Sequence, residues 1–171
     1  MSFNEVKSHS VTWTAFVRIT HWLVATCVLI NFFNDTGFLH RLIGYCCLGL
    51  VMLRIIDGLY ISNVPSSKLY VPSIKNIKTH LSELLSRQVS PTVGHNPLGQ
   101  WAVYVMWVLI AFLALSGWLS RTDKYWGVDW PVDLHMILSN VLQCVVVLHV
   151  LAVLVMSKLE KQNLVKRMIK R

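Results

Sequence analysis

Four stretches of this chain are long and apolar enough to cross a lipid bilayer. They cover residues 13–33, 38–61, 97–119 and 131–156. An α-helix rises about 1.5 Å per residue, so roughly 20 residues span the hydrocarbon core. The chain is 54% hydrophobic and only 14% charged, which leaves too little polar surface to cover a soluble globule. The sequence therefore predicts an all-α fold, an integral membrane four-helix bundle formed by residues 1–171 as a single domain.

The first stretch has a competing interpretation as a signal peptide, because Lys7 precedes it and Arg18 and His21 interrupt it. No A-x-A-like cleavage site follows Phe33, however, and residues 34–37 (Asn-Asp-Thr-Gly) favour a tight turn into the next helix. We therefore expect the first stretch to be retained as a membrane helix.

The basic residues are distributed unequally between the two sides of the predicted bundle. If both termini lie on one side, that side holds 13 of the 16 lysines and arginines, and the other side holds only Arg41, Arg121 and Lys124. The positive-inside rule then places both termini in the cytoplasm. This placement explains the net charge of +8 better than nucleic-acid binding does, so we expect no nucleic-acid partner.

The long cytoplasmic loop, residues 62–96, contains one more periodic element. Its apolar residues recur at helical spacing as Ile74, Ile77, Leu81 and Leu84. This pattern predicts an interfacial helix on the cytoplasmic membrane surface, in contact with lipid. Docking of a protein partner is the alternative.

Four histidines lie within the apolar stretches, where an ionisable side chain usually has a function. His21 lies roughly 18 Å inward from the outer end of the first helix, whereas His40 lies just inside the outer end of the second. On the fourth helix His135 comes first and His149 follows roughly 21 Å deeper, on nearly the same helical face. Depth therefore pairs His40 with His135 on the outer side and His21 with His149 on the inner side.

Histidine supplies the imidazole nitrogen that haem iron takes as an axial ligand, so two pairs could hold two haems. No C-x-x-C-H motif for covalent attachment is present, which predicts non-covalent b haems. The four cysteines are expected to be free thiols in apolar surroundings. A structural or proton-relay role for the histidines is the alternative. No general base, nucleophile or metal cluster for substrate chemistry is evident, so we predict no catalytic residue.

Three further residues fit two haem sites at these depths. Gly44 is one turn from His40 and would let a flat macrocycle approach the backbone, although close helix packing is an alternative. Arg54 lies 14 residues past His40, at the inner level, and is a candidate partner for haem propionates. Arg18 is one turn from His21 and could serve the same haem or extend to the inner interface.

The remaining histidines are expected to lie outside the bundle. His95 precedes the third helix at the cytoplasmic boundary, where it could bind an inner propionate or cap the helix. His80 and His9 are expected to be solvated. With His95, Tyr45 and Trp22 are candidates to line a quinone site, because they lie near the haem levels in the sequence.

A series of motifs resembles the bacterial cytochrome b561 family, which includes the b-type cytochrome subunits of nickel-iron hydrogenases. In chain order they are VRITHW (17–22), HRLIGY (40–45), RIIDGLY (54–60), GHNPLG (94–99), SGW (116–118), YWG followed by LH (125–135), LHVLAVL (148–154) and NLVKRMI (163–169). The resemblance implies a four-helix cytochrome of the bacterial inner membrane with two b haems that exchanges electrons with quinone. It also implies His21, His40, His135 and His149 as iron ligands. Asp57 departs from the family pattern, which often has an aromatic residue there.

Two functions follow from this resemblance. In the first, the chain passes electrons between a periplasmic donor, such as superoxide or a small redox protein, and the quinone pool of the respiratory chain. In the second, it is the membrane-anchor cytochrome b subunit of a larger dehydrogenase or hydrogenase complex. Whether it is an enzyme by itself, and whether it forms a homodimer, stays open. A transporter is disfavoured because broken helices and paired half-repeats are not evident.

Overall fold

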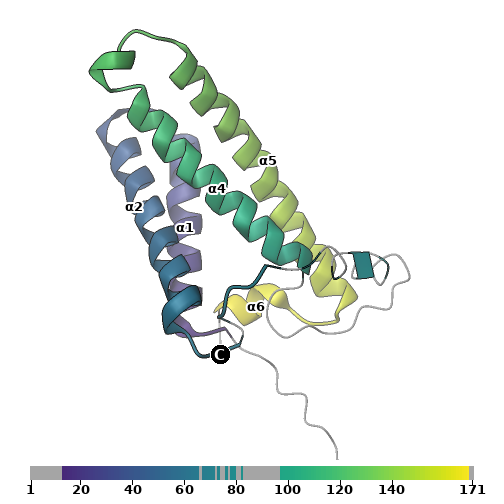
Figure 1. The fold of residues 1–171 in the computed structure, drawn as a ribbon. Helices are drawn as coiled ribbons and strands as arrows, with labels where there is room; N and C mark the ends of the chain where they lie inside the picture. The colour runs from purple at the N-terminus through teal and green to yellow at the C-terminus, as the bar shows by residue number, and fades with distance from the viewer. Residues whose placement is uncertain are drawn as a thin grey trace, which may run out of the picture.

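The fold is a bundle of long helices, shown by a computed structural model that describes residues 13–65, 67–71, 73, 76, 78–79, 82 and 97–169 (Figure 1). The long helices are α1 (Ala15–Phe33), α2 (Gly37–Ile56), α4 (Pro97–Leu119) and α5 (Trp130–Leu159). Each is long and apolar enough to cross a membrane. No strand occurs among the described residues. The predicted all-α membrane bundle is confirmed.

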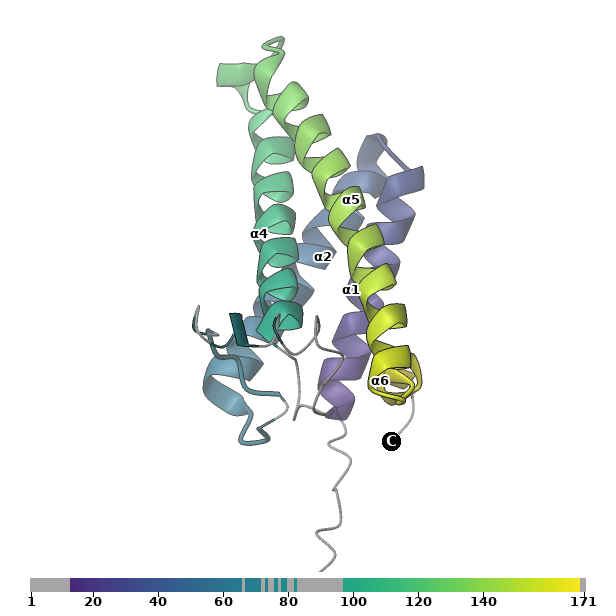
Figure 2. The same ribbon diagram turned by 90° about the vertical axis from the view of Figure 1, so that its right-hand side faces the viewer.

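The bundle consists of two antiparallel hairpins, α1 with α2 and α4 with α5, which meet through α2 and α4 (Figures 1 and 2). The connections within the hairpins are short, with the 3-10 turn η2 (Asp123–Tyr125) between α4 and α5. Both connections lie at one end of the bundle, here called the turn end. The other end, where α1 begins and α5 leads into the short helix α6 (Leu164–Ile169), is called the α6 end.

The side chains inside the bundle form only a small buried core, and many large apolar side chains point outward. The core residues are Cys47, Val51, Leu109, Ile110 and Leu142. In the most apolar span, α5, only 6% of the 18 consecutive residues with the highest hydropathy are buried inside the protein. This distribution suits a lipid solvent, because acyl chains cover apolar surface that water would not.

Local signals explain most of the helix boundaries. Thr14 caps α1 by accepting a hydrogen bond from the Val17 amide at 3.3 Å, so α1 begins two residues later than predicted. Pro131 lies in the first turn of α5, where its missing N–H costs no hydrogen bond. The second predicted stretch, residues 38–61, is an α-helix to Ile56 and continues as the π-helix η1 (Asp57–Ile61).

A segment after η1 fastens three helices together at the α6 end, and we call residues 67–70 the clasp. The Ser67 carbonyl accepts a hydrogen bond from Arg54 Nη2 on α2 at 2.8 Å. The Ser67 hydroxyl lies 3.0 Å from Thr14 Oγ1 at the start of α1. The Tyr104 hydroxyl on α4 donates to the Tyr70 carbonyl at 2.8 Å. The clasp thus joins the two hairpins through both side-chain and backbone groups.

Gly58 makes this close approach of the clasp possible. The Leu69 amide donates to the Gly58 carbonyl at 3.1 Å. A Cβ atom at position 58 would lie 2.5 Å from Leu69 Cγ and 2.6 Å from Arg54 Nη1, closer than real Cβ contacts. A side chain at position 58 would therefore force the Leu69 and Arg54 side chains to shift, and glycine allows the packing that is observed.

Helix α6 was not predicted as a separate element. It lies across the α6 end and is held to α1 by a 3.1 Å hydrogen bond from Trp22 Nε1 to the Met168 carbonyl (Figure 2). The predicted interfacial helix lies mostly outside the described residues. Of its segment, Asn76, Lys78, Thr79 and Ser82 are described, and all four are helical.

Candidate functional site

The two histidines predicted for the outer pair lie together near the turn end. His40 lies in the first turn of α2 and His135 in the second turn of α5. Their ring centres are 5.9 Å apart and the ring planes meet at 69°. Because α2 and α5 make little backbone contact, the two side chains approach each other across a space between the hairpins.

Hydrogen bonds determine which nitrogen each of these rings presents to that space. His40 Nδ1 lies 2.6 Å from the Asn34 carbonyl, and His135 Nδ1 lies 3.0 Å from the Leu113 carbonyl and 3.1 Å from Ser116 Oγ. A carbonyl oxygen only accepts hydrogen bonds, so the proton of each neutral ring belongs on Nδ1. The Nε2 lone pairs are then left available for another partner.

The space between these rings is a predominantly apolar cavity. It is lined by residues of all four long helices, among them Asn31, His40, Gly44, Cys47, Gly117 and His135. A Cβ atom at position 117 would lie only 3.2 Å from His135 Cε1, so glycine gives this ring its room. Gly44, which was predicted to lie beside the site, is part of the cavity wall. A Cβ atom at this position would lie 3.6 Å from Asn31 Nδ2.

The predicted inner pair, His21 on α1 and His149 on α5, lies nearer the α6 end. The two side chains are close enough to interact electrostatically. Their helices, like α2 and α5, make little backbone contact with each other. His21 Nδ1 is buried and has no hydrogen-bond partner among the described residues, and the same is true of Arg18 Nη1 one turn earlier. Buried polar atoms of this kind need a further polar group, from water or from a ligand, to satisfy them.

Arg54, predicted to lie at the depth of the inner histidine pair, forms an ion pair and a hydrogen bond within the protein. Its Nη1 lies 3.5 Å from the Asp57 carboxylate, and its Nη2 donates to the Ser67 carbonyl of the clasp. Asp57, the departure from the motif, thus serves as the counter-ion of a buried arginine. The guanidinium retains further N–H donors beyond these two contacts.

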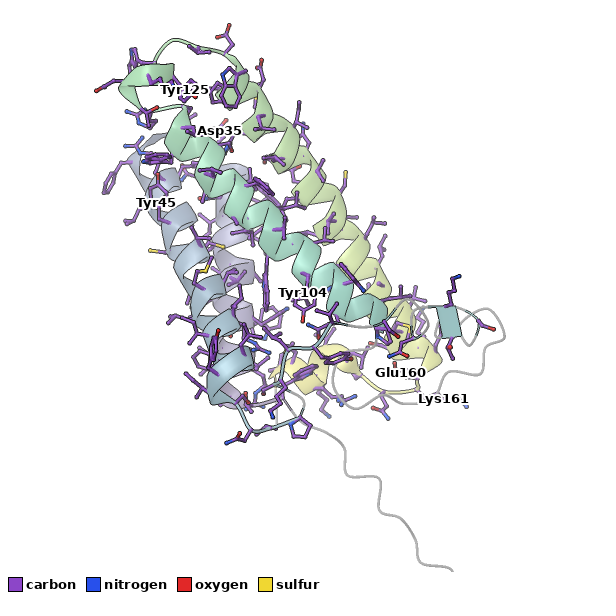
Figure 3. All side chains as sticks on the ribbon, in the orientation of Figure 1. Asp35, Tyr45, Tyr104, Tyr125, Glu160 and Lys161 are labelled. Carbon is purple, nitrogen blue, oxygen red and sulfur yellow. The ribbon has the colours of Figure 1, made fainter. Side chains whose placement is uncertain are left out.

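The candidate quinone-site residues lie at opposite ends of the bundle. Tyr45 lines the cavity near the turn end, and Figure 3 shows it on α2 far from Tyr104 of α4. Trp22 adjoins His21, with ring centres 5.4 Å apart, and its indole N–H is already used by α6. His95, His80 and His9 lie outside the described residues.

Sequence reasoning missed the residues that orient the rings. Asn34 and Leu113 contribute backbone carbonyls, which no side-chain pattern reveals. Ser116 and Gly117 had a signal, because the SGW motif places two small residues together in an otherwise bulky helix. Reading that pair as room for a neighbouring ring would have located the wall beside His135.

Comparison with known proteins identifies one relationship. A family model described as prokaryotic cytochrome b561 matches residues 12–171, which include all four long helices, η1 and α6. No curated protein and no solved structure matches the chain.

Proposed function

The chain belongs to the prokaryotic cytochrome b561 family, and we propose that it carries electrons across the membrane through two b haems. Family membership and the four apolar helices make it a multi-pass membrane protein of electron transfer that binds b-type haem. The finer proposal assigns one haem to His40 and His135 and the other to His21 and His149.

The spacing of His40 and His135 is the observation that carries this proposal. A metal–imidazole bond is about 2 Å long and the ring centre lies roughly 1 Å beyond the nitrogen, so rings on opposite sides of one iron stand about 6 Å apart. The observed separation is 5.9 Å. Their Nδ1 hydrogen bonds would leave Nε2 free to bind a metal, and such a bond on the other nitrogen is what orients a histidine ligand.

The donor set favours haem over a bare metal ion. Among the described residues, no group of three or more histidines, cysteines or acidic residues could hold a metal ion. A pair of histidines is sufficient for haem, because the macrocycle supplies the other four ligands. When bound, haem iron would accept and release single electrons.

At the α6 end the protein would hold the second haem by different means. His21 and His149 would supply the axial nitrogens, and the partnerless Nη1 of Arg18 would donate to a propionate. His95 and the remaining donors of Arg54 are further candidates for the same carboxylates. The buried donors favour a ligand with negative charges at this level.

The charge distribution supports an orientation with the α6 end in the cytoplasm. Lysine and arginine residues are concentrated at this end and its connecting segments, and the positive-inside rule favours a cytoplasmic side for such residues and hence for both termini. Electrons would then pass between a periplasmic donor at the turn end, such as superoxide or a small redox protein, and membrane quinone. Of the candidate quinone-site residues, Tyr45 would line a site near the turn end, whereas Trp22 and His95 would line one near the α6 end. Their side chains would line the quinone site, and any proton uptake would be left to the quinone at a haem edge.

The alternative function is that of an anchor subunit for a larger dehydrogenase or hydrogenase. A direct experiment is to reconstitute the purified, haem-loaded protein in vesicles and mix the reduced protein with a soluble quinone analogue. We expect haem oxidation on a turnover timescale. Lack of quinone reactivity, together with co-purification of a catalytic dehydrogenase subunit from native membranes, would assign the chain to the anchor class instead.

A further inference from the structure

A groove runs between the last turns of α5 and helix α6 at the α6 end of the bundle. Its walls combine exposed basic and apolar side chains, including Lys158, Lys161, Lys166, Leu154, Val165 and Ile169. No acidic residue lines it. This combination is unusual for a surface that meets water alone and is typical of a surface that meets phospholipid.

The three lysines have no fixed counter-ion within the described part of the chain. The ion pair found there joins Arg54 and Asp57 on another element, and none involves the groove lysines. Three ammonium groups that line one groove repel each other, and an anion between them would offset this repulsion. The groove therefore presents concentrated positive charge to its surroundings.

The connection between α5 and α6 has a defined backbone shape. Lys161 adopts a left-handed conformation with φ of 52°, which reverses the chain after α5. The Ser157 hydroxyl accepts a hydrogen bond from the Leu164 amide at 3.2 Å, and the Asn163 side chain accepts one from the Lys166 amide at 2.7 Å. The first bond holds the start of α6 beside α5 and the second caps α6, and the lysines from both helices line one groove.

The position of α6 sets the height of the groove relative to the bilayer. Met168 of α6 bonds to Trp22, which lies seven residues, or about 10 Å, into the membrane-spanning helix α1. The headgroup region beside each face of the hydrocarbon core is several Å thick. Helix α6 therefore lies beside the first turns of a membrane-spanning helix, within reach of lipid rather than beyond the end of the bundle.

We propose that this groove binds an anionic phospholipid, with the headgroup phosphate held between Lys158 and Lys166 and the acyl chains lying along Leu154 and Ile169. The charge of the groove selects an anionic over a zwitterionic headgroup, and the apolar wall selects a lipid over a soluble phosphate compound. The proposal does not depend on the haem assignment.

The test measures lipid retention by native mass spectrometry of the full-length, haem-loaded protein, purified with phosphatidylglycerol or phosphatidylcholine of the same acyl chains. We expect preferential retention of phosphatidylglycerol by the unmodified protein. The double variant Lys158→Gln/Lys166→Gln should reduce that retention by about tenfold or more, because each lysine near a membrane surface contributes to binding an anionic lipid. Lys158→Arg/Lys166→Arg should keep it, since the positive charges remain.

A matched control removes the same charge elsewhere. Arg121 and Lys124 are exposed at the turn end of the bundle and lie outside the groove, so Arg121→Gln/Lys124→Gln should leave retention unchanged. Equal losses in both double variants would overturn the proposal in favour of general surface attraction, and no loss in either would also overturn it. Loss of a second copy of the chain instead of lipid would assign the groove to a dimer contact. The haem absorption spectrum checks that each variant is folded.

Discussion

The hydrogen bonds to His40 and His135 explain how two rings on different helices could serve one metal. Each ring has its Nδ1 beside a main-chain carbonyl, so rotation about the side-chain bonds is restricted. Ser116 adds a second contact to His135, and Gly117 leaves room for the ring. Such support reduces the conformational entropy that the histidine side chains would lose on binding a metal, and it fixes the nitrogen that would face the iron.

The pairing of the histidines predicts which haem each variant loses. The purified protein should contain two non-covalent, low-spin b haems. His40→Ala or His135→Ala should remove the haem near the turn end, and His21→Ala or His149→Ala should remove the one near the α6 end, because each haem loses an axial ligand. Redox titration of the haem absorption bands distinguishes the two.

A purified, fully loaded protein with only one haem would contradict this assignment. Loss of the same haem from both the His21 and the His135 variants would show that the pairs are wrong. A Gly49→Ala variant is a suitable control, since a Cβ atom at that position meets nothing within 4 Å and both haems should remain.

At the residue level, the sequence was informative where the depth of two residues in the membrane is enough to predict that they lie close together. Helical rise was sufficient to predict that His40 and His135 lie close together. It could not predict that Arg54 contacts Asp57 and the Ser67 carbonyl, because that choice depends on the path of the chain after α2. The carbonyl partners of the histidine rings were equally unpredictable, since every residue has a carbonyl.

Among the elements, the π-helix η1 and the clasp have no counterpart in the prediction. Hydrophobic periodicity continues through residues 57–61, so the sequence indicates one uninterrupted helix. The wider turn of η1 is accompanied by the Arg54–Asp57 ion pair and by Gly58 against Leu69. The π-helix is therefore associated with tertiary contacts to the clasp, which local sequence preferences do not reveal.

The clasp makes a prediction about Arg54. Arg54→Ala should keep both haems but lower the thermal stability of the bundle, on the order of 2 to 3 kcal/mol, because Asp57 and the Ser67 carbonyl lose their buried partner. It should also lower the midpoint potential of the haem near the α6 end, since a lost positive charge favours the oxidised state. Thermal unfolding followed by haem absorbance, together with redox titration, measures both effects.

The double variant Arg54→Ala/Asp57→Ala separates the two causes. It removes a neutral pair, so the potential should return toward that of the unmodified protein, while part of the stability loss persists because the Ser67 carbonyl still lacks its donor. An Arg54→Ala variant with unaltered stability and potential would rule out both roles.

Boundaries of the spanning helices were well predicted where chemistry marks them. The third helix begins at Pro97 and ends at Leu119, as expected, because proline suits the first helical position and the polar turn follows. The fourth continues to Leu159, three residues beyond the prediction, since Ser157 and Lys158 can be helical outside the hydrocarbon core. Helix α6 has only six residues, too few to give a clear periodic signal.

For the whole molecule, the two hairpins meet mainly through α2 and α4, whereas both histidine pairs reach from α5 to the opposite hairpin. Haem binding at either pair would therefore connect hairpins that share little other contact. Composition and hydropathy were sufficient to predict four helices in one membrane bundle. They could not predict this unequal packing, because lipid and protein interiors select similar side chains.

The 14 residues between His135 and His149 also have an electrical consequence. Along α5 they correspond to about 21 Å, or roughly two thirds of a hydrocarbon core about 30 Å thick. One charge that crosses the whole membrane gains or loses about 2.3 kcal/mol per 100 mV, so an electron that moves between the two proposed haems would gain or lose about 1.5 kcal/mol.

In vesicles with an imposed potassium diffusion potential of 100 mV, negative on the side of the α6 end, the electron distribution between the haems should shift about tenfold toward the turn end. Absorbance of the two haems during the voltage step measures this shift, and a distribution indifferent to voltage would mean that both haems lie at one depth. In the proposed orientation, electron transfer through the protein would thus be coupled to the membrane voltage, so that the cell's energised state would oppose inward flow and assist outward flow.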